Sequence, residues 1–169
     1  MNMSVRSIVC LLLILSLAAC GYRLKSAVEL DVAYDKTYIQ HAISAPLYRP
    51  LALALANQGV NLEEDASEAT AKLLIVKDNL TKQIQSIGTN NRVQEYRLDY
   101  EVVFAVHFLD QIKVPEQTLT LSRDFAFDIG QITGTQAEEQ VLRQQMHQDM
   151  AQMIIRAIAN QNKGSQVVE

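Results

Sequence analysis

The side chains that most often carry chemistry are few in this sequence. It contains two cysteines, Cys10 and Cys20, and three histidines, His41, His107 and His147. A thiol can act as a nucleophile, and cysteine and histidine together can bind zinc. This set cannot supply four zinc ligands without carboxylates, and the histidines fall on different predicted elements with no common spacing. We therefore predict no metal site and no histidine-centred catalysis.

Two carboxylates, Asp124 and Asp128, are the remaining candidates for acid–base chemistry. They flank the end of a predicted strand on one face, where carboxylates are usually solvated. His107 is expected to be a packed or edge residue, and His147 an exposed one. The sequence has no GxSxG, P-loop or HExxH motif. These observations predict a protein that is not an enzyme and holds no cofactor.

The N-terminus explains both cysteines. Residues 1–19 contain Arg6, then an apolar run and two alanines, which is the layout of a secretory signal peptide. The run is too short to span comfortably a bilayer core of about 30 Å. Cys10 would be removed with this signal peptide, so the mature chain would contain neither a disulfide nor a free thiol.

The last residues of that segment, Leu17-Ala18-Ala19-Cys20, resemble the bacterial lipobox. The resemblance implies that the Cys20 thiol receives a diacylglycerol, that a peptidase cuts before it, and that the new amine is acylated, for example with palmitate. Gly21 stands where an Asp commonly marks inner-membrane retention, which favours the outer membrane. Several acyl chains give firm anchoring, because each buried CH₂ contributes about 0.8 kcal/mol.

Length and composition limit the classes of protein that the rest of the chain can be. With 169 residues, 49% of them hydrophobic and 20% charged, the chain is expected to form one globular domain. Its 15 Lys and Arg stand against 19 Asp and Glu, for a net charge of −4. This balance argues against a nucleic-acid partner, which would require a basic face.

Hydrophobic periodicity and turn residues predict six elements. In chain order they are a strand over 29–34, a helix opened by Ser44 and ended near Gly59, strands over 71–84, 95–108 and 117–127, and a helix from Thr135 to Asn160. Pro50 should kink the first helix or move its start later. Pro115 should lie outside the ladder of the last strand, and Thr135 with Glu138 forms a capping box for the last helix. The methionines of that helix are expected in the core.

This order predicts an α+β, two-layer sandwich in which two helices pack on a four-stranded, mostly antiparallel sheet with a long central hairpin. The predicted boundaries are a lipoprotein signal peptide at 1–19, a lipidated tether at 20–28, a single α+β domain at 29–160 and a flexible tail at 161–169. The charged half of the hairpin should project toward water or a polar partner.

Basic residues lie on both strands near the predicted hairpin end. Lys82 approaches the turn, and Arg92 and Arg97 leave it. A basic tip can bind a phosphate group. Lysine and arginine can equally protect exposed strand ends from aggregation, and the sequence alone favours this second interpretation.

Three short segments and the order of the elements resemble the LptE family of LPS-assembly lipoproteins over nearly the whole mature chain. The segments are Cys20-Gly21-Tyr22-Arg23-Leu24, Gly59-Val60 and Glu95-Tyr96-Arg97-Leu98. The resemblance implies an outer-membrane lipoprotein, anchored on the periplasmic side, that sits in the lumen of the β-barrel LptD. It further implies a role as plug and assembly partner in the delivery of lipopolysaccharide, with candidate LPS phosphate contacts at Arg92, Lys82 and Arg97.

Two other functions remain open at this point. The first is a periplasmic auxiliary lipoprotein of a phospholipid-transport system. The second is a lipoprotein hydrolase, which would need an activated nucleophile, and no serine is placed beside a histidine in the predicted elements.

Overall fold

The computed structural model describes residues 30, 32–109, 111–128, 130 and 132–165. The predicted signal peptide, the lipidation site Cys20 and the tether over 20–28 lie outside the described residues, as do residues 166–169 of the predicted tail. The elements in chain order are η1 (Val32–Tyr34), β1 (Lys36–Gln40), α2 (Tyr48–Ala56), β2 (Asn61–Leu62), β3 (Ala71–Ile87), β4 (Val93–Phe108), β5 (Gln111–Ala126) and α3 (Ile132–Ser165).

The described strands form one mixed sheet of five strands in the order β2-β1-β3-β4-β5. β3, β4 and β5 pair antiparallel, whereas β1 runs parallel to both β2 and β3. The α+β class and the two helices are confirmed, but the prediction of four mostly antiparallel strands is wrong in the number of strands and in the direction of β1.

The first strand was predicted too early in the sequence. Val32–Tyr34 is a 3-10 helix, and Val32 is 78% exposed. The true strand buries Thr37 and Ile39. The Thr37 hydroxyl donates a hydrogen bond of 2.8 Å to the Tyr34 carbonyl oxygen, so a polar side chain is buried with its hydrogen bond satisfied. A polar residue on the inner face hides the alternation by which a strand is recognised.

The first helix starts later than its predicted cap, as Pro50 indicated. Helix α2 begins at Tyr48, and the capping position is Leu47, without a side-chain hydrogen bond; the prediction of Ser44 as the cap is wrong. Pro50 therefore lies in the first helical turn, where an amide hydrogen has no intrahelical partner to lose. Gly59 has a φ of +83°, which confirms the predicted glycine stop.

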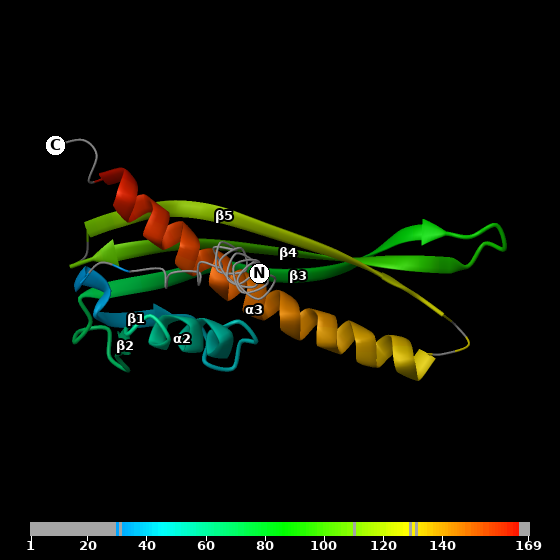
Figure 1. Cartoon of the computed structure of the whole chain (residues 1–169), viewed down its shortest axis with the longest axis horizontal. Coiled ribbons are helices and arrows are strands. Elements are labelled where there is room, and N and C mark those ends of the chain that lie inside the picture. The colour runs from blue at the N-terminus through cyan, green and yellow to red at the C-terminus, as the bar shows by residue number, and fades with distance from the viewer. Residues whose placement is uncertain (1–29, 31, 110, 129, 131, 166–169) are drawn as a thin grey trace, which may run out of the picture.

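The long hairpin of β3 and β4 is confirmed and is longer than predicted at the β3 end. β3 has 17 residues and β4 has 16, and the pair runs along the long axis of the molecule (Figure 1). A turn with Asn91 at φ +57° joins them. At about 3.3 Å per residue each strand spans more than 50 Å, well beyond an ordinary strand. The hairpin therefore carries its tip far from β1 and α2.

Strand β5 includes Pro115, contrary to expectation. On β4, Val106 pairs with Val114 of β5, but Phe104, two residues earlier, pairs with Gln117, three residues further along β5. The register therefore shifts between these pairs, and Pro115 lies in this irregular part of the ladder. β5 is also an edge strand of the sheet. A missing amide hydrogen costs little at an edge or a bulge, so proline does not interrupt the strand.

Helix α3 is longer than predicted at both ends. It begins at Ile132 and continues to Ser165, past the expected end at Asn160. Thr135 lies inside its first turn and is buried, so the predicted capping box over Thr135 and Glu138 is wrong. Met146 and Met150 are fully buried, as predicted.

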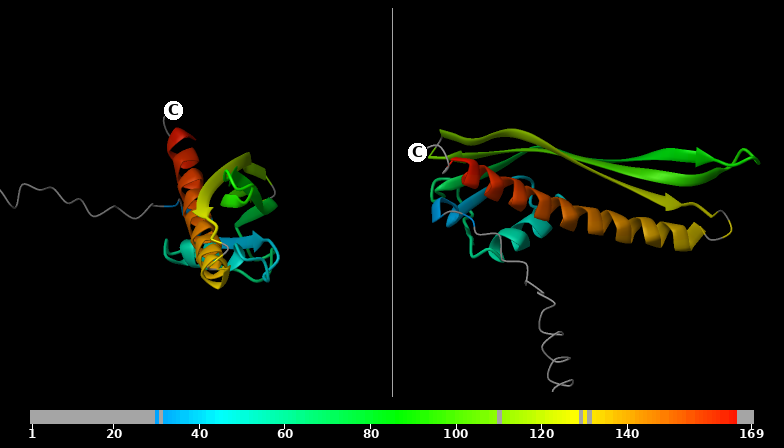
Figure 2. Two further views of the ribbon diagram at one scale, coloured as in Figure 1. Left: turned by 90° about the vertical axis from the view of Figure 1, so that its right-hand side faces the viewer. Right: turned by 45° about the horizontal axis from the view of Figure 1, so that its top comes forward.

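Both helices lie on one side of the sheet, as Figures 1 and 2 show. The core fills the space between them and the inner face of the sheet, with Leu51, Phe104 and Ile154 among its fully buried side chains. α3 runs on beneath the outer half of the hairpin (Figure 2). The other face of the β3-β4-β5 ribbon carries no described helix.

Candidate functional site

The hairpin tip is the part of the molecule that the sequence singled out. The amide of Gly88 donates to the carbonyl oxygen of Arg92 at 2.8 Å, and the Asn91 amide donates to that of Gly88 at 2.9 Å. The Asn90 side chain accepts a further bond of 3.2 Å from the Arg92 amide. These bonds hold the Arg92 backbone in a closed turn at the end of the ribbon.

The Arg92 side chain is exposed at this tip. Among the residues that the structure describes, no carboxylate forms an ion pair with it. It borders a hollow of about 350 Å³ that is also lined by Val93, Phe127 and Asp128. An arginine without an internal partner, beside apolar side chains, can donate paired hydrogen bonds to a phosphate or carboxylate of a ligand.

Lys82 does not share this position. Cross-strand pairing with Leu98, which is fully buried, places Lys82 on the inner face of the sheet. Its Nζ lies 2.5 Å from Glu139 Oε2 on α3 and 4.1 Å from the centre of the Tyr96 ring. Partial burial raises the pKa of Glu139, but hydrogen bonds from Lys82 and Arg143 outweigh it and lower the pKa overall. Lys82 therefore joins the hairpin to α3.

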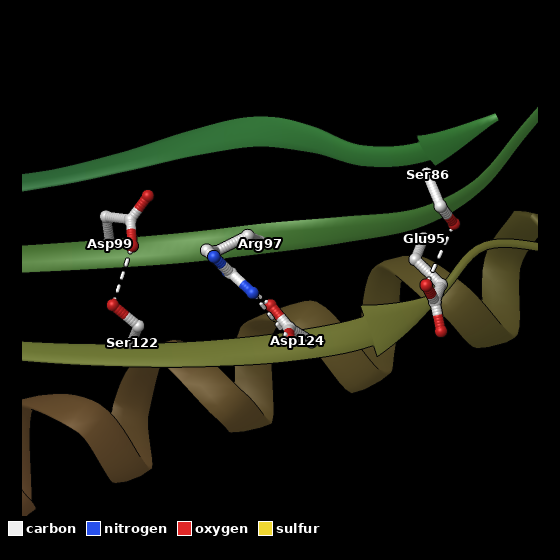
Figure 3. Close-up of polar contacts among 6 residues, drawn as sticks. All are labelled: Ser86, Glu95, Arg97, Asp99, Ser122 and Asp124. Carbon is white, nitrogen blue, oxygen red and sulfur yellow. Dashed lines mark hydrogen bonds and ion pairs between the residues drawn. The ribbon is translucent and has the colours of Figure 1, made fainter.

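Arg97 is paired on the opposite face. It lies across from Asp124 on β5, and its Nε and Nη2 donate to the two carboxylate oxygens at 2.7 and 3.0 Å (Figure 3). Hydrogen bonding to Arg97 holds the pKa of Asp124 below its ordinary value. The three predicted phosphate contacts are thus divided among the tip, the inner face and the outer face, and only Arg92 is at the tip.

The uncovered outer face of the ribbon is polar and internally paired. Figure 3 shows the Ser122 hydroxyl donating to Asp99 at 2.7 Å and the Ser86 hydroxyl donating to Glu95 at 2.8 Å. Further along, Lys77 Nζ lies 2.7 Å from Glu101. The charged face of the hairpin therefore points away from the helices. A face of fixed donors and acceptors fits water or another polar surface, not a core.

Four side chains at the middle of the ribbon form a hydrogen-bonded chain that sequence reasoning missed. His41 Nε2 lies 2.9 Å from Asp78, the Tyr100 hydroxyl donates to Asp78 at 2.9 Å, and His147 Nδ1 lies 3.1 Å from the Tyr100 oxygen. Burial first, and then the bond to Asp78, raise the pKa of Tyr100. The predicted exposure of His147 is wrong, because it is half-buried against the Tyr100 ring.

The remaining sequence candidates are separated. His107 lies between Lys72 and Ile112 near the end of β4, which is an interior strand of the sheet, and it is half-buried, so it is a packed residue and not an edge one. Asp124 pairs with Arg97, whereas Asp128 accepts a bond from the Gly130 amide at 2.8 Å. These two carboxylates therefore have different partners. No group of three side chains suited to a metal ion occurs in the described part of the chain.

A groove of about 690 Å³ separates α2 from α3. Leu53 and Ala54 contribute its apolar side, and Gln144, Gln148 and Gln152 line the other wall. No nucleophile with an adjacent base lines it. Within the described ranges, no helix combines the length and apolar character needed to cross a bilayer.

These features define a class of protein: a small α+β binding or scaffold module with a long polar ribbon. The family model for LptE, described as lipopolysaccharide-assembly, matches residues 27–158. The chain belongs to this family of LPS-assembly lipoproteins, which is an assembly family and not an enzyme family.

Solved structures show the same fold. Lipoprotein B from Nitrosomonas europaea has a TM-score of 0.70 at 24% identity, with 82% of this chain and 90% of that chain covered. The minor lipoprotein from Acinetobacter baumannii has a TM-score of 0.64 at 24% identity, covering 76% and 93%. The rare lipoprotein B from Shewanella oneidensis has a TM-score of 0.68 at 20% identity, covering 78% and 98%. None of the curated proteins matches the sequence.

Proposed function

We propose that this protein is an outer-membrane lipoprotein that forms a complex with an LptD-type β-barrel and assists the delivery of lipopolysaccharide to the cell surface. The family match over residues 27–158 carries the proposal, because it spans nearly all of the folded domain. The proposed location is the periplasmic side of the membrane, within the barrel lumen.

The polar outer face of the ribbon supports the proposed complex with the barrel. The lumen of an outer-membrane barrel is polar, so a protein inside it must present polar groups outward. The outer face meets this need with pairs such as Arg97 with Asp124 and Lys77 with Glu101, whose charges are already balanced. Balanced pairs lose less on contact with a second polar surface than isolated charges would.

The proposed anchor is the lipid on Cys20. The predicted tether covers residues 20–28, so residues 21–28 would form the connection. Eight extended residues reach at most about 29 Å. The anchor would therefore keep the domain within about one bilayer thickness of the membrane surface.

Direct binding of lipopolysaccharide is proposed at the tip, through Arg92. A guanidinium without an internal carboxylate can form charge-assisted hydrogen bonds to a lipid A phosphate. Lys82 and Arg97 would contribute less, because Glu139 and Asp124 already pair with them.

The test is isolation of the LptD-type barrel from outer membranes of cells that produce this chain, followed by quantitative mass spectrometry. We expect one copy of the protein per barrel and a loss of surface lipopolysaccharide when the protein is depleted. A barrel without a stoichiometric copy would refute the complex. Unchanged surface lipopolysaccharide with altered phospholipid asymmetry would favour the alternative of a phospholipid-transport auxiliary.

A further inference from the structure

The hydrogen-bonded chain at the middle of the ribbon joins separate parts of the fold. His41 follows β1 and precedes α2, Asp78 lies on β3, Tyr100 on β4 and His147 on α3. The side chains of His41 and Asp78 are each only 14% exposed, and Tyr100 is 1% exposed. These four residues therefore tie the helical layer to the sheet where α3 passes from the core to the outer half of the hairpin.

Chemistry fixes the direction of every bond in this chain. A carboxylate can only accept, so Asp78 takes a hydrogen from His41 Nε2 and another from the Tyr100 hydroxyl. The Tyr100 oxygen has then used its hydrogen and must accept one from His147 Nδ1. In the neutral form of His147 that makes this bond, Nδ1 carries the proton and Nε2 is unprotonated, so a second proton would bind at Nε2.

A second proton on His147 would place a cation in a half-buried position. Burial lowers the pKa of His147 most, and the Arg143 charge one helical turn away lowers it further, whereas Asp78 acts in the opposite direction. Hydrogen bonds link His147 to the titratable groups Tyr100, Asp78 and His41. The charged groups paired between α3 and the neighbouring strands, or along α3, are Lys82 and Arg143 with Glu139, and Arg123 with Asp149.

Most of these surrounding charges are already balanced. Lys82 and Arg143 both contact Glu139, and Arg123 Nη2 lies 3.2 Å from Asp149. Among the four hydrogen-bonded residues, Asp78 is the one with a carboxylate, and this carboxylate already accepts two hydrogen bonds. Few unpaired negative groups therefore remain to stabilise an imidazolium at position 147. The charged form of His147 is better solvated in water than in the folded site.

We propose that the chain His41–Asp78–Tyr100–His147 is a proton-sensitive clasp that fastens α3 to the sheet at neutral pH and loosens it in mildly acidic surroundings. The sign follows from linkage. The unfolded or opened state binds the proton more tightly, so the stabilisation is complete above the ordinary histidine pKa of about 6.5. It falls as the pH drops from there toward the lower pKa of folded His147. Opening would separate α3 from the inner face of the hairpin. The inference does not depend on a barrel partner.

Hydrogen exchange measured by mass spectrometry on the full lipidated chain in detergent micelles tests the clasp. Wild type, His147→Gln and the matched control His107→Gln are measured at pH 7.5 and at pH 5.0, and the three proteins are compared with one another at the same pH. Glutamine keeps a donor for Tyr100 but does not titrate. For each unit by which folding lowers the His147 pKa, opening of α3 around residue 147 should rise about tenfold at acid pH.

We expect this extra opening in wild type and in His107→Gln, and not in His147→Gln. Equal acid-induced opening in wild type and His147→Gln would overturn the proposal. A second measurement does not depend on the stability of that variant: an NMR titration of the three histidines in wild type, with His41→Gln and His107→Gln used for assignment. A His147 resonance that titrates at or above about 6.5 would also overturn it.

Discussion

Removal of the Tyr100 hydroxyl tests whether the buried chain stabilises the fold. Tyr100→Phe keeps the ring, which is buried in the core and packs edge-on against His147 with centroids 5.0 Å apart. It removes the donor to Asp78 and the acceptor for His147 Nδ1 at once. The substitution therefore isolates two hydrogen bonds from the packing around them.

The expected magnitude follows from what each bond contributes. A hydrogen bond to a charged group contributes about 1.5–3 kcal/mol, and a neutral one about 0.5–1.5 kcal/mol. The side chain of Asp78 is 14% exposed and keeps its bond from His41, so water and the histidine recover part of the loss. We expect the free energy of unfolding to fall by about 2–3 kcal/mol at pH 7.5.

Urea denaturation followed by circular dichroism measures this loss on the full chain. Tyr38→Phe is the matched control, because Tyr38 is half-buried and its hydroxyl makes no hydrogen bond to a described residue. It should change the free energy of unfolding by less than about 0.5 kcal/mol. Equal values for the two variants would show that the buried chain contributes nothing to stability, and the reasoning would fail.

Three further predictions concern the tip, the anchor and one turn. Arg92→Asp should weaken binding to lipid A in vesicles about tenfold. Arg156→Asp makes the same charge change on an exposed part of α3 and should leave the affinity unchanged. Equal affinities for the two variants would refute a phosphate contact at Arg92. Cys20→Ala should abolish the lipid-bearing mass and membrane retention while leaving the circular dichroism spectrum unchanged; an unaltered mass shift contradicts this. Gly59→Ala should destabilise the domain by about 1 kcal/mol, because Gly59 has φ +83°, and Gly59→Asn should cost less; no loss on thermal melting would show that the turn relaxes.

The sequence predicted those elements whose pattern repeats many times. In β4, alternation over more than a dozen residues identified the strand, and its inner residues Leu98, Val102 and Phe104 are fully buried. In α3, residues four apart such as Met146 and Met150 lie in the core. A long repeat is informative because one face of each element must be apolar over its whole length.

Short or locally satisfied elements could not be predicted. β1 buries Thr37 through a bond to its own neighbouring backbone, and β2 contains only two residues. Pro115 was excluded from a strand because the sequence does not reveal that β5 is an edge. In each case a tertiary neighbour, and not the local pattern, decides which conformation has the lower free energy.

The candidate site divides in the same way. Sequence alone identified Arg92, Lys82 and Arg97 as cations near one turn, but strand pairing decides that Lys82 meets Glu139 and Arg97 meets Asp124 on opposite faces. Adjacent residues in a strand point to opposite faces, so nearness in sequence separates side chains as readily as it joins them.

What the sequence determined by itself is the α+β class, the long hairpin, the two amphipathic helices and the resemblance to an LPS-assembly family, because these depend on periodicity and residue order. Only the tertiary structure decided the fifth strand, the parallel pairing of β1 and the chain from His41 to His147. The side chains of that chain lie on four separate segments. A hydrogen bond needs atoms about 3 Å apart, and only the packing of α3 on the sheet brings them to that distance.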